Sequence, residues 1–210
     1  MQETQHDDFI IGPDDPILIT GASGFIGSRL VECLLERGFR NVRCFTRPTS
    51  EIAGIDDLTG RSGSGTHIRL VTGNLLSKED CTASTKDVKV IFHLATGRDG
   101  KSYPDAFMNA VVTTRNLLEA SLQHQCLRRF VSISSFAVYT NIDKPGGRLL
   151  DESCPMEKHP ELRGDAYSFA KVKQDEIVTE YGNKFGIPYV IVGRDTFWVR
   201  TSRASVVAWV

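Results

Sequence analysis

The sequence predicts an α/β fold, in which a doubly wound parallel sheet is covered by helices on both faces. Three observations predict it. Short apolar runs alternate with longer amphipathic stretches along the 210 residues, a glycine-rich turn follows the first apolar run, and the run at residues 90–94 is suited to burial on both faces. Right-handed crossover connections would order the strands 3-2-1-4-5-6.

The first part of the chain contains four expected strands and one helix. The strands are expected at Ile17–Thr20, Val42–Thr46, Ile68–Val71 and Val88–Leu94. A helix is expected from Phe25 to Arg37, because apolar residues recur on one face and Gly38 follows as a stop. The segment from Pro48 to Thr66 is rich in Gly, Ser and Asp, and we interpret most of it as surface loop.

The second part continues the alternation of helices and strands. Helices are expected at Tyr103–Gln123 and Ala166–Tyr181, and strands at Phe130–Ser134 and Pro188–Val192. The segment from Asn141 to Gly164 is long, polar and proline-containing, which indicates a flexible stretch above a site.

The composition excludes several classes of function. The net charge of −1 gives no electrostatic basis for binding nucleic acid or an anionic membrane, and no apolar run approaches the roughly 20 residues of a bilayer span. Five dispersed cysteines lack the Cys/His spacing of a metal site, and the N-terminus is too polar for a signal peptide. We expect a soluble cytoplasmic protein with reduced thiols and no metal.

The turn at Thr20–Gly27 lies where the first strand passes into the first helix. Gly21 permits a tight turn, Gly24 lets a pyrophosphate approach the backbone, and Gly27 allows close packing of helix and strand. The alternative is a turn selected for packing alone, but the flanking strand and helix favour a dinucleotide site in a Rossmann-type fold. The expected contacts are Gly21, Ser23, Gly24, Phe25, Ile26 and Gly27.

The end of the second strand bears on which dinucleotide binds. It has no acid to hold a ribose 2′-hydroxyl, and Arg47 occupies that region. A guanidinium can bind a 2′-phosphate, so NADP is favoured over NAD. The alternative is a solvated arginine at a strand end.

Tyr167 and Lys171 stand one helical turn apart in the last predicted helix. Side chains at i and i+4 share a helix face, so the Lys171 charge is expected to favour the Tyr167 phenolate. Such a pair can perform acid–base chemistry near neutral pH, although chance alone could supply this spacing.

Four elements now occur in one order: the glycine turn, His93-Leu94-Ala95, Ser134–Tyr139, and Tyr167–Lys171. Together they resemble an extended short-chain dehydrogenase/reductase of the NAD-dependent epimerase/dehydratase family. The dihydroflavonol-reductase-like and sugar-epimerase-like members are particularly similar, and the resemblance covers about residues 16 to 194.

The resemblance implies catalytic roles. Tyr167 would be the general acid–base, Lys171 would bind the nicotinamide ribose and tune Tyr167, and Ser135 would hydrogen-bond the reacting carbonyl or hydroxyl. Asn109 would help to order a proton-relay water. Arg47 would face the 2′-phosphate, and the remaining dinucleotide contacts would be Asn74 and Leu75 near the adenine, with Leu94, Ala95 and Thr96.

Several of these residues have a structural alternative. Ser135 could satisfy a strand end, and Asn109 could be a surface amide or stabilise a kink. His93 is expected to be a buried, hydrogen-bonded core histidine rather than a catalytic group. Tyr139 is expected to serve packing.

The resemblance also narrows the reaction. Family dehydratases carry an Asp-Glu pair just after the active hydroxyl, where this chain has Phe136 and Ala137. Dehydration is therefore disfavoured, whereas carbonyl reduction, alcohol oxidation and epimerisation through a ketone stay open. The substrate would be a small-molecule secondary alcohol or ketone of the sugar-nucleotide, steroid-like or flavonoid-like kind.

The chain departs from the family pattern at Asn74, where Asp is usual, at Thr140, where Gly is usual, and after Val192, where Arg-Pro is usual. We expect a polar tail at residues 1–13, an NAD(P)-binding Rossmann domain with the catalytic residues at 14–195, and a short remnant at 196–210 in place of most of the substrate lobe. The apolar run Val206–Val210 would need burial, by an intramolecular cap or in a homodimer. The alternative function is a dinucleotide-binding sensor or inactive truncated member.

Overall fold

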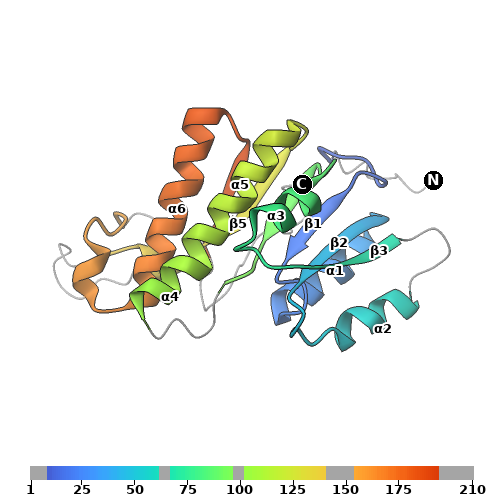
Figure 1. Cartoon of the computed structure of the whole chain (residues 1–210), viewed down its shortest axis with the longest axis horizontal. Coiled ribbons are helices and arrows are strands. Elements are labelled where there is room, and N and C mark those ends of the chain that lie inside the picture. The colour runs from blue at the N-terminus through green and yellow to red at the C-terminus, as the bar shows by residue number, and fades with distance from the viewer. Residues whose placement is uncertain (1–8, 62–66, 97–101, 141–153, 194–210) are drawn as a thin grey trace, which may run out of the picture.

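The computed structural model describes residues 9–61, 67–96, 102–140 and 154–193, except for the side chains of residues 58–61. Within them, six parallel strands form one sheet in the order β3-β2-β1-β4-β5-β6 (Figure 1). This confirms the predicted doubly wound α/β fold and its strand order. The order reverses between β1 and β4, which is where such sheets bind ligands.

The strands are β1 (Ile17–Thr20), β2 (Asn41–Thr46), β3 (His67–Thr72), β4 (Val90–His93), β5 (Arg129–Ile133) and β6 (Tyr189–Val192). The helices are α1 (Phe25–Glu36), α2 (Ala53–Arg61), α3 (Lys78–Thr85), α4 (Tyr103–Phe107), α5 (Thr113–His124) and α6 (Ala166–Phe185). Shorter turns are the π-helical η1 (Met108–Val112) and the 3-10 helices η2 (Phe136–Val138) and η3 (Pro160–Arg163). Every predicted strand is present, with boundaries shifted by no more than two residues.

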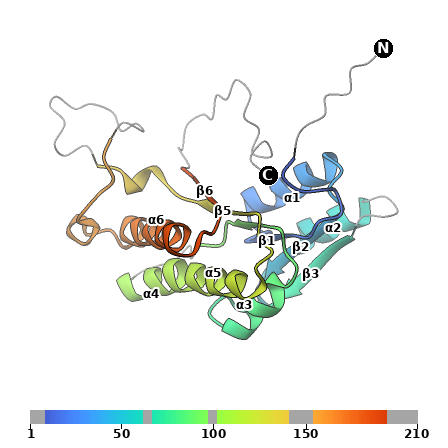
Figure 2. The same cartoon turned by 90° about the horizontal axis from the view of Figure 1, so that it is seen from above.

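Two apolar clusters fill the space between sheet and helices, because successive side chains of a buried strand point to opposite faces. Ile17 and Ile19 of β1 pack with α1 residues such as Leu34 on one face, while Leu18 packs with α5 residues such as Leu117 on the other. Figure 2 shows α1 and α2 on one side of the sheet and α3, α5 and α6 on the other. The predicted cover of helices on both faces is confirmed.

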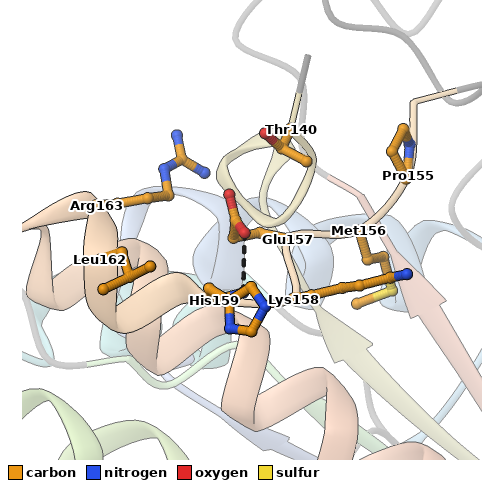
Figure 3. Close-up of a pocket in the computed structure, with 8 residues that line it drawn as sticks. All are labelled: Thr140, Pro155, Met156, Glu157, Lys158, His159, Leu162 and Arg163. Atoms are coloured by element: carbon orange, nitrogen blue, oxygen red, sulfur yellow. Dashed lines mark hydrogen bonds between the residues drawn. The ribbon is translucent and has the colours of Figure 1, made fainter. Parts of the chain in front are cut away.

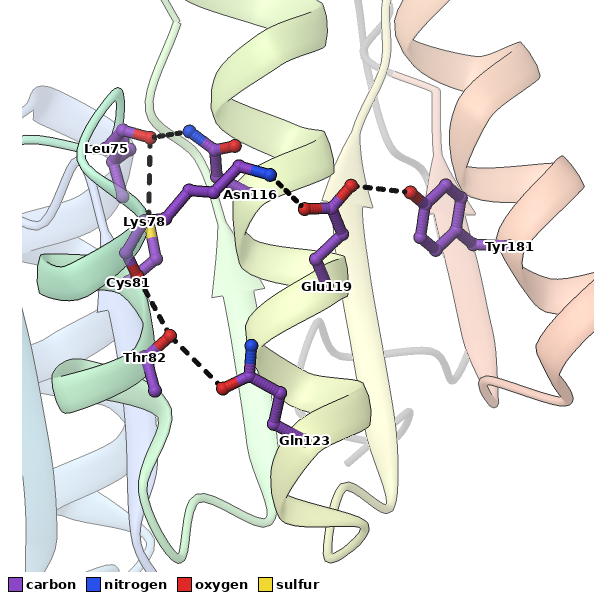
Figure 4. Close-up of polar contacts among 8 residues, drawn as sticks. All are labelled: Leu75, Lys78, Cys81, Thr82, Asn116, Glu119, Gln123 and Tyr181. Carbon is purple, nitrogen blue, oxygen red and sulfur yellow. Dashed lines mark hydrogen bonds and ion pairs between the residues drawn. The ribbon is translucent and has the colours of Figure 1, made fainter.

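Polar contacts join the three helices on the second face (Figure 4). Asn116 of α5 is buried and donates its Nδ2 to the carbonyl of Leu75 at 2.9 Å. Glu119 of α5 accepts from the Lys78 ammonium of α3 at 2.9 Å and from the Tyr181 hydroxyl of α6 at 3.2 Å. These contacts fix the loop after β3 relative to α3 and α5 and join α5 to α6.

The interpretation of Pro48–Thr66 as mostly loop is wrong, because α2 occupies residues 53–61. Its two glycines and two aspartates obscure the helical pattern. Ile55 anchors the helix, because it is fully buried in the apolar cluster that contains the core residues of α1. The helix α3 was not predicted either. Its signal is a helix cap, since the Ser77 hydroxyl accepts from the Asp80 amide at 3.1 Å.

The helix expected at Tyr103–Gln123 is interrupted by the π-helical turn η1. Short π-helical insertions occur frequently at functional sites. Here the turn contains Asn109, one of the predicted catalytic residues.

Three predictions concern residues outside the described ranges: the first part of the polar tail at 1–8, the first part of the long polar segment Asn141–Gly164, which is residues 141–153, and the C-terminal remnant with Val206–Val210. The described end of that long segment is ordered by a bridge between Tyr139 and Met156 and by η3. No helix in the described ranges is both long enough and apolar enough to cross a membrane.

Candidate active site

The candidate site lies at the edge of the sheet where the parallel strands end. Because β1 to β5 all run in one direction, their carboxyl ends meet there. The glycine turn follows β1, Arg47 follows β2, Asn74 follows β3, Leu94 follows β4 and Ser135 follows β5. Residues far apart in the sequence therefore share one edge, as a dinucleotide fold requires.

The glycine turn is tightly packed at two of its glycines. Gly21 has a left-handed φ of 71°, and a Cβ there would lie 2.8 Å from the Ala95 nitrogen. A Cβ at Gly27 would lie 2.2 Å from the Gly21 carbonyl oxygen and 2.7 Å from the Ala22 Cα. Both contacts are with backbone, so neither position tolerates a side chain.

The N-terminus of α1 is open to an anion. The cap residue Gly24 has no side chain to bond the first amides, and the first turn of the helix has no acidic residue. The first N–H groups of a helix lack intrahelical partners and carry partial positive charge. Ser23, Gly24 and Phe25 are exposed, whereas Ile26 is half-buried and Gly27 is buried. These features fit the pyrophosphate of a dinucleotide.

Arg47 and Asn74 follow β2 and β3 at the same edge of the sheet as this turn. Arg47 is exposed at the end of β2, and its guanidinium has no ion-pair partner among the described residues. Asn74 is exposed, and its side-chain oxygen accepts from the Leu76 backbone amide at 3.0 Å. The backbone amide of Asn74 donates to the Asp80 carboxylate at 2.7 Å. The Leu75 side chain is buried in the core. Asn74 thus orders the loop, and the Leu75 side chain faces away from solvent.

The segment after β4 borders the turn directly. The Leu94 amide donates to the Thr20 carbonyl at 3.2 Å, and the Ala95 amide donates to the Thr20 hydroxyl at 3.2 Å. Leu94 and Ala95 are half-buried and Thr96 is exposed. These three residues form one wall beside Gly21.

Lys171 is buried beneath the edge, with only 3% of its surface exposed. Its ammonium donates to the carbonyl oxygen of Ile133 at 2.7 Å and to Oε1 of Gln174 at 2.9 Å. Burial lowers its pKa to about 8, although the charge of Asp175 raises it in part. An ammonium that titrates near neutral pH, with two of its three protons engaged, can bind a ligand hydroxyl with the third.

Tyr167 lies in the first turn of α6, one turn before Lys171, and is 44% exposed. Its hydroxyl has no hydrogen-bond partner among the described residues, and no bond joins it to the Lys171 ammonium. Asp165 caps the helix by accepting from the Tyr167 amide at 3.0 Å and from the Ser168 amide at 3.1 Å. The cap fixes where α6 begins and therefore where the Tyr167 side chain emerges.

Ser135 is buried at the end of β5, and its hydroxyl accepts from the Ala137 amide at 3.2 Å as the cap of η2. The structural alternative for Ser135 is thus realised, and its hydroxyl proton is still available to a substrate oxygen. The neighbouring Ser134 hydroxyl donates to the Asp175 carboxylate. Burial raises the pKa of Asp175 to about 6, against the opposing effects of Ser134 and Lys171.

Asn109 is exposed, and its Nδ2 donates to the carbonyl of Asp105 at 2.8 Å. Its own carbonyl accepts from the Thr113 hydroxyl at 2.8 Å. Asn109 therefore forms hydrogen bonds with neighbouring groups around the π-helical turn. This agrees with the alternative in which Asn109 stabilises a kink.

His93 is a buried core histidine, as predicted. It is 1% exposed, its Nδ1 lies 2.7 Å from the Thr20 hydroxyl, and its Nε2 lies 2.9 Å from the Thr114 hydroxyl. Burial, with a smaller effect of the Lys171 charge, lowers its pKa to about 3, so the ring is neutral.

Sequence reasoning missed Thr114 and Gln174, which are both fully buried polar residues. The Gln174 amide nitrogen donates to the Thr114 hydroxyl at 3.0 Å and so joins α6 to α5. The available signal was the position of Gln174, three residues after Lys171 on the same helix face. Nothing in the sequence marked Thr114 as its partner.

A pocket is lined by residues of the segment that connects β5 to α6 (Figure 3). It is lined by Thr140, Pro155, Met156, Glu157, Lys158, His159, Leu162 and Arg163. The Arg163 guanidinium donates to the carbonyl of Ala137 at 2.7 Å, and the His159 amide donates to Glu157 at 2.9 Å. None of the predicted site residues lines it.

Comparison with known proteins identifies the family. The profile of the NAD dependent epimerase/dehydratase family matches residues 17–194, which is most of the chain. The chain belongs to this family. The match includes β1, the glycine turn, α6 and β6, so all the described elements that form the edge lie within it.

Curated relatives of the chain include both reductases and epimerases. Cinnamoyl-CoA reductase 1 of Oryza sativa subsp. japonica is 29% identical over 183 residues, which cover 86% of this chain and 53% of the relative. A UDP-glucose 4-epimerase of Schizosaccharomyces pombe is 29% identical over 150 residues, covering 67% of this chain and 41% of the relative. The chain thus spans about half the length of the relatives that it matches, or less.

Solved structures share the fold. The UDP-glucuronic acid 4-epimerase of Bacillus cereus, solved in complex with NAD, is 27% identical and superposes with a TM-score of 0.65, covering 84% of this chain and 55% of the epimerase. The chain is accordingly a member of a family of nicotinamide-dependent epimerases, dehydratases and reductases.

Proposed function

We propose that this chain supplies the cofactor-binding and acid–base part of an NAD(P)-dependent oxidoreductase or epimerase that acts on a secondary alcohol or ketone. The unit responsible is residues 14–195. When bound, the nicotinamide would supply or accept the hydride, and the chain's own residues would hold the cofactor and move the proton.

The observation that supports this proposal best is the surroundings of Lys171. A lysine is almost never buried without a functional or structural partner, and here the ammonium lies beneath the carboxyl end of β5. Tyr167 precedes it by one turn on the same helix, and the open N-terminus of α1 lies at the same edge of the sheet. Acid–base and anion-binding groups therefore converge on one edge.

In this proposal Tyr167 gives a proton to a developing alkoxide during reduction, or takes one during oxidation. Lys171 binds the nicotinamide ribose with its remaining N–H and favours the tyrosinate by its charge. Ser135 donates its hydroxyl proton to the reacting oxygen. Asn109 has the weakest case for a catalytic role, because its side-chain amide already bonds the helix backbone.

The preferred cofactor is NADP. The support is Arg47, an exposed guanidinium at the end of β2 with no ion-pair partner among the described residues. A charge-assisted hydrogen bond contributes about 1.5–3 kcal/mol, so Arg47→Ala should weaken NADPH binding by about tenfold to a hundredfold. NADH lacks the 2′-phosphate, and its affinity should change little. Equal losses for both dinucleotides in a fluorescence titration would contradict the preference.

Turnover is tested with the purified chain, NADPH or NADH, and a panel of ketones that includes sugar-nucleotide, steroid and flavonoid compounds. We expect Tyr167→Phe to abolish turnover while leaving the dissociation constant of the cofactor nearly unchanged. If cofactor affinity is lost together with activity, the tyrosine has a structural role. Tight cofactor binding without turnover on any compound would support the alternative of a dinucleotide-binding module.

A further inference from the structure

A continuous line of hydrogen bonds runs through the core from α6 to the glycine turn. It joins Lys171 to Gln174 at 2.9 Å, Gln174 to Thr114 at 3.0 Å, Thr114 to His93 at 2.9 Å, and His93 to Thr20 at 2.7 Å. Four of these residues are no more than 1% exposed, and Lys171 is 3% exposed. The line joins the helix layer on one face to the sheet, since its members come from α6, α5, β4 and β1.

The Thr114 hydroxyl fixes the direction of its neighbours. It has a single proton, which it donates to the carbonyl oxygen of Ala110 at 2.6 Å. It can therefore only accept from the two groups that face it, the Gln174 amide nitrogen and the His93 Nε2. It follows that His93 carries its proton on Nε2.

The other ring nitrogen then has to accept. The His93 ring is neutral, so Nδ1 is unprotonated and takes a hydrogen bond from the Thr20 hydroxyl. The Thr20 oxygen in turn accepts from the Ala95 amide, beside the glycine turn. One assignment of protons satisfies every bond at this end of the line.

The same logic fixes the Gln174 amide. Its NH₂ group points to Thr114, so its carbonyl oxygen faces the Lys171 ammonium. A flipped amide would place two donors against each other at Lys171 and would leave Gln174 without a donor to Thr114. The Lys171 ammonium is thus held by two acceptors, Oε1 of Gln174 and the carbonyl of Ile133.

We propose that Gln174, Thr114 and His93 are positioning residues that hold the Lys171 ammonium at a fixed place relative to the Thr20–Gly21 turn. They would thereby set the distance between the group that binds the nicotinamide ribose and the turn that binds the pyrophosphate. The consequence for the cofactor rests on the proposed function, whereas the bonding pattern itself does not.

The first test examines the unmodified protein by long-range ¹H–¹⁵N NMR of its histidines, with His93 assigned through His93→Asn. We expect a neutral ring with the proton on Nε2, unchanged from pH 8 to pH 5. A proton on Nδ1, or titration of this ring within that range, would overturn the proposal. Thr114→Ser should keep the Nε2 tautomer, whereas Thr114→Val, which removes the shared acceptor, should lose it.

The second test measures the pKa of Lys171 by NMR of labelled lysine side chains, assigned through Lys171→Arg. The titratable groups near this ammonium in the described chain are His93 on β4 with Tyr167 and Asp175 on α6. Gln174→Leu removes an acceptor and should lower the pKa, and Gln174→Glu adds an opposite charge and should raise it, each by about one unit.

The control for this second test is Glu176→Gln, on the exposed face of α6, where Glu176 pairs with Lys173 at 2.8 Å. It should leave the pKa of Lys171 unchanged. A purely structural role for Gln174 would not shift Lys171 in opposite directions, so shifts of one sign, or none, would overturn the proposal. Both tests use the protein without cofactor, so failure to bind NADPH would refute the proposed function and leave these results interpretable.

Discussion

Lys171, the residue proposed to bind the nicotinamide ribose, illustrates how burying a charge lowers stability. A buried ammonium loses its hydration, and its two acceptors recover only part of that loss, which is why burial lowers its pKa from 10.5 to about 8. A binding role for the ammonium would explain why this position has a charged residue despite the loss of stability. Residues whose burial opposes folding are therefore good candidates for function.

This cost should be visible as a dependence of stability on pH. Between about pH 8 and 10.5, Lys171 is protonated in the unfolded chain but not in the folded one, so the free energy of unfolding should rise with pH, by up to about 3 kcal/mol. Urea denaturation of the wild type and of Lys171→Met measures it. The Lys171→Met variant should lack this rise in the free energy of unfolding. An identical pH profile for both proteins would contradict the lowered pKa of Lys171.

The glycines of the turn permit a second prediction with a matched pair. Gly27→Ala places a Cβ 2.2 Å from the Gly21 carbonyl oxygen and should destabilise the protein by about 1–3 kcal/mol or more. Gly54→Ala, in α2, meets nothing within 4 Å and should be neutral or stabilising by up to about 1 kcal/mol. Thermal denaturation of both variants checks this. Equal effects would show that the turn is looser than described.

At the scale of elements, α6 carries Tyr167 and Lys171, the proposed acid–base pair, and its first turn is capped by one residue. Asp165 accepts from two amides of the first turn and from the Ser168 hydroxyl. Burial alone would raise the pKa of Asp165, but the hydrogen bonds from Ser168 and Tyr167 outweigh it and lower the pKa.

Asp165→Ala should therefore lower the free energy of unfolding by about 1 kcal/mol at neutral pH, because the first amides lose their acceptor. Asp165→Asn keeps a side-chain oxygen and should cost less. Because the lowered pKa means that the carboxylate stabilises the fold mainly above its ordinary pKa, the difference between wild type and Asp165→Ala should shrink as the pH falls into the acid range. A difference independent of pH would exclude the carboxylate as the cap.

Elements with strong periodicity were predictable from the sequence, and weakly patterned ones were not. The strands and α1 follow from apolar runs, and Tyr167, Lys171 and the glycine turn follow from spacing. The helix α2 was missed because its composition is unfavourable for a helix, and the burial of Ile55 that anchors it depends on tertiary packing. The Gln174–Thr114 contact joins residues 60 positions apart, and no local pattern encodes such a contact.

At the scale of the whole molecule, the strand order brings the glycine turn, Arg47, Leu94 and Ser135 to one edge of the sheet, and the Lys171 ammonium bonds the carbonyl of Ile133 at the end of β5. That edge lies within the part of the chain that the family profile matches. The unit proposed to bind the cofactor therefore consists of the described sheet and its helices. None of the proposed site residues is given a role in selecting the substrate.

The most direct test is cofactor-dependent thermal stabilisation of the 210-residue chain, compared with Gly24→Asp. NADPH at about 100 times its dissociation constant should add about 2.7 kcal/mol, which raises the Tm of a chain of this size by about 5–10 °C. Gly24→Asp gains a capping carboxylate but places a Cβ 3.3 Å from the Gly21 carbonyl oxygen, so the Tm without cofactor should change little. Its carboxylate should repel the pyrophosphate and remove the shift. No shift of the wild type with NADPH or NADH, or an equal shift in the variant, would contradict a dinucleotide site at this turn.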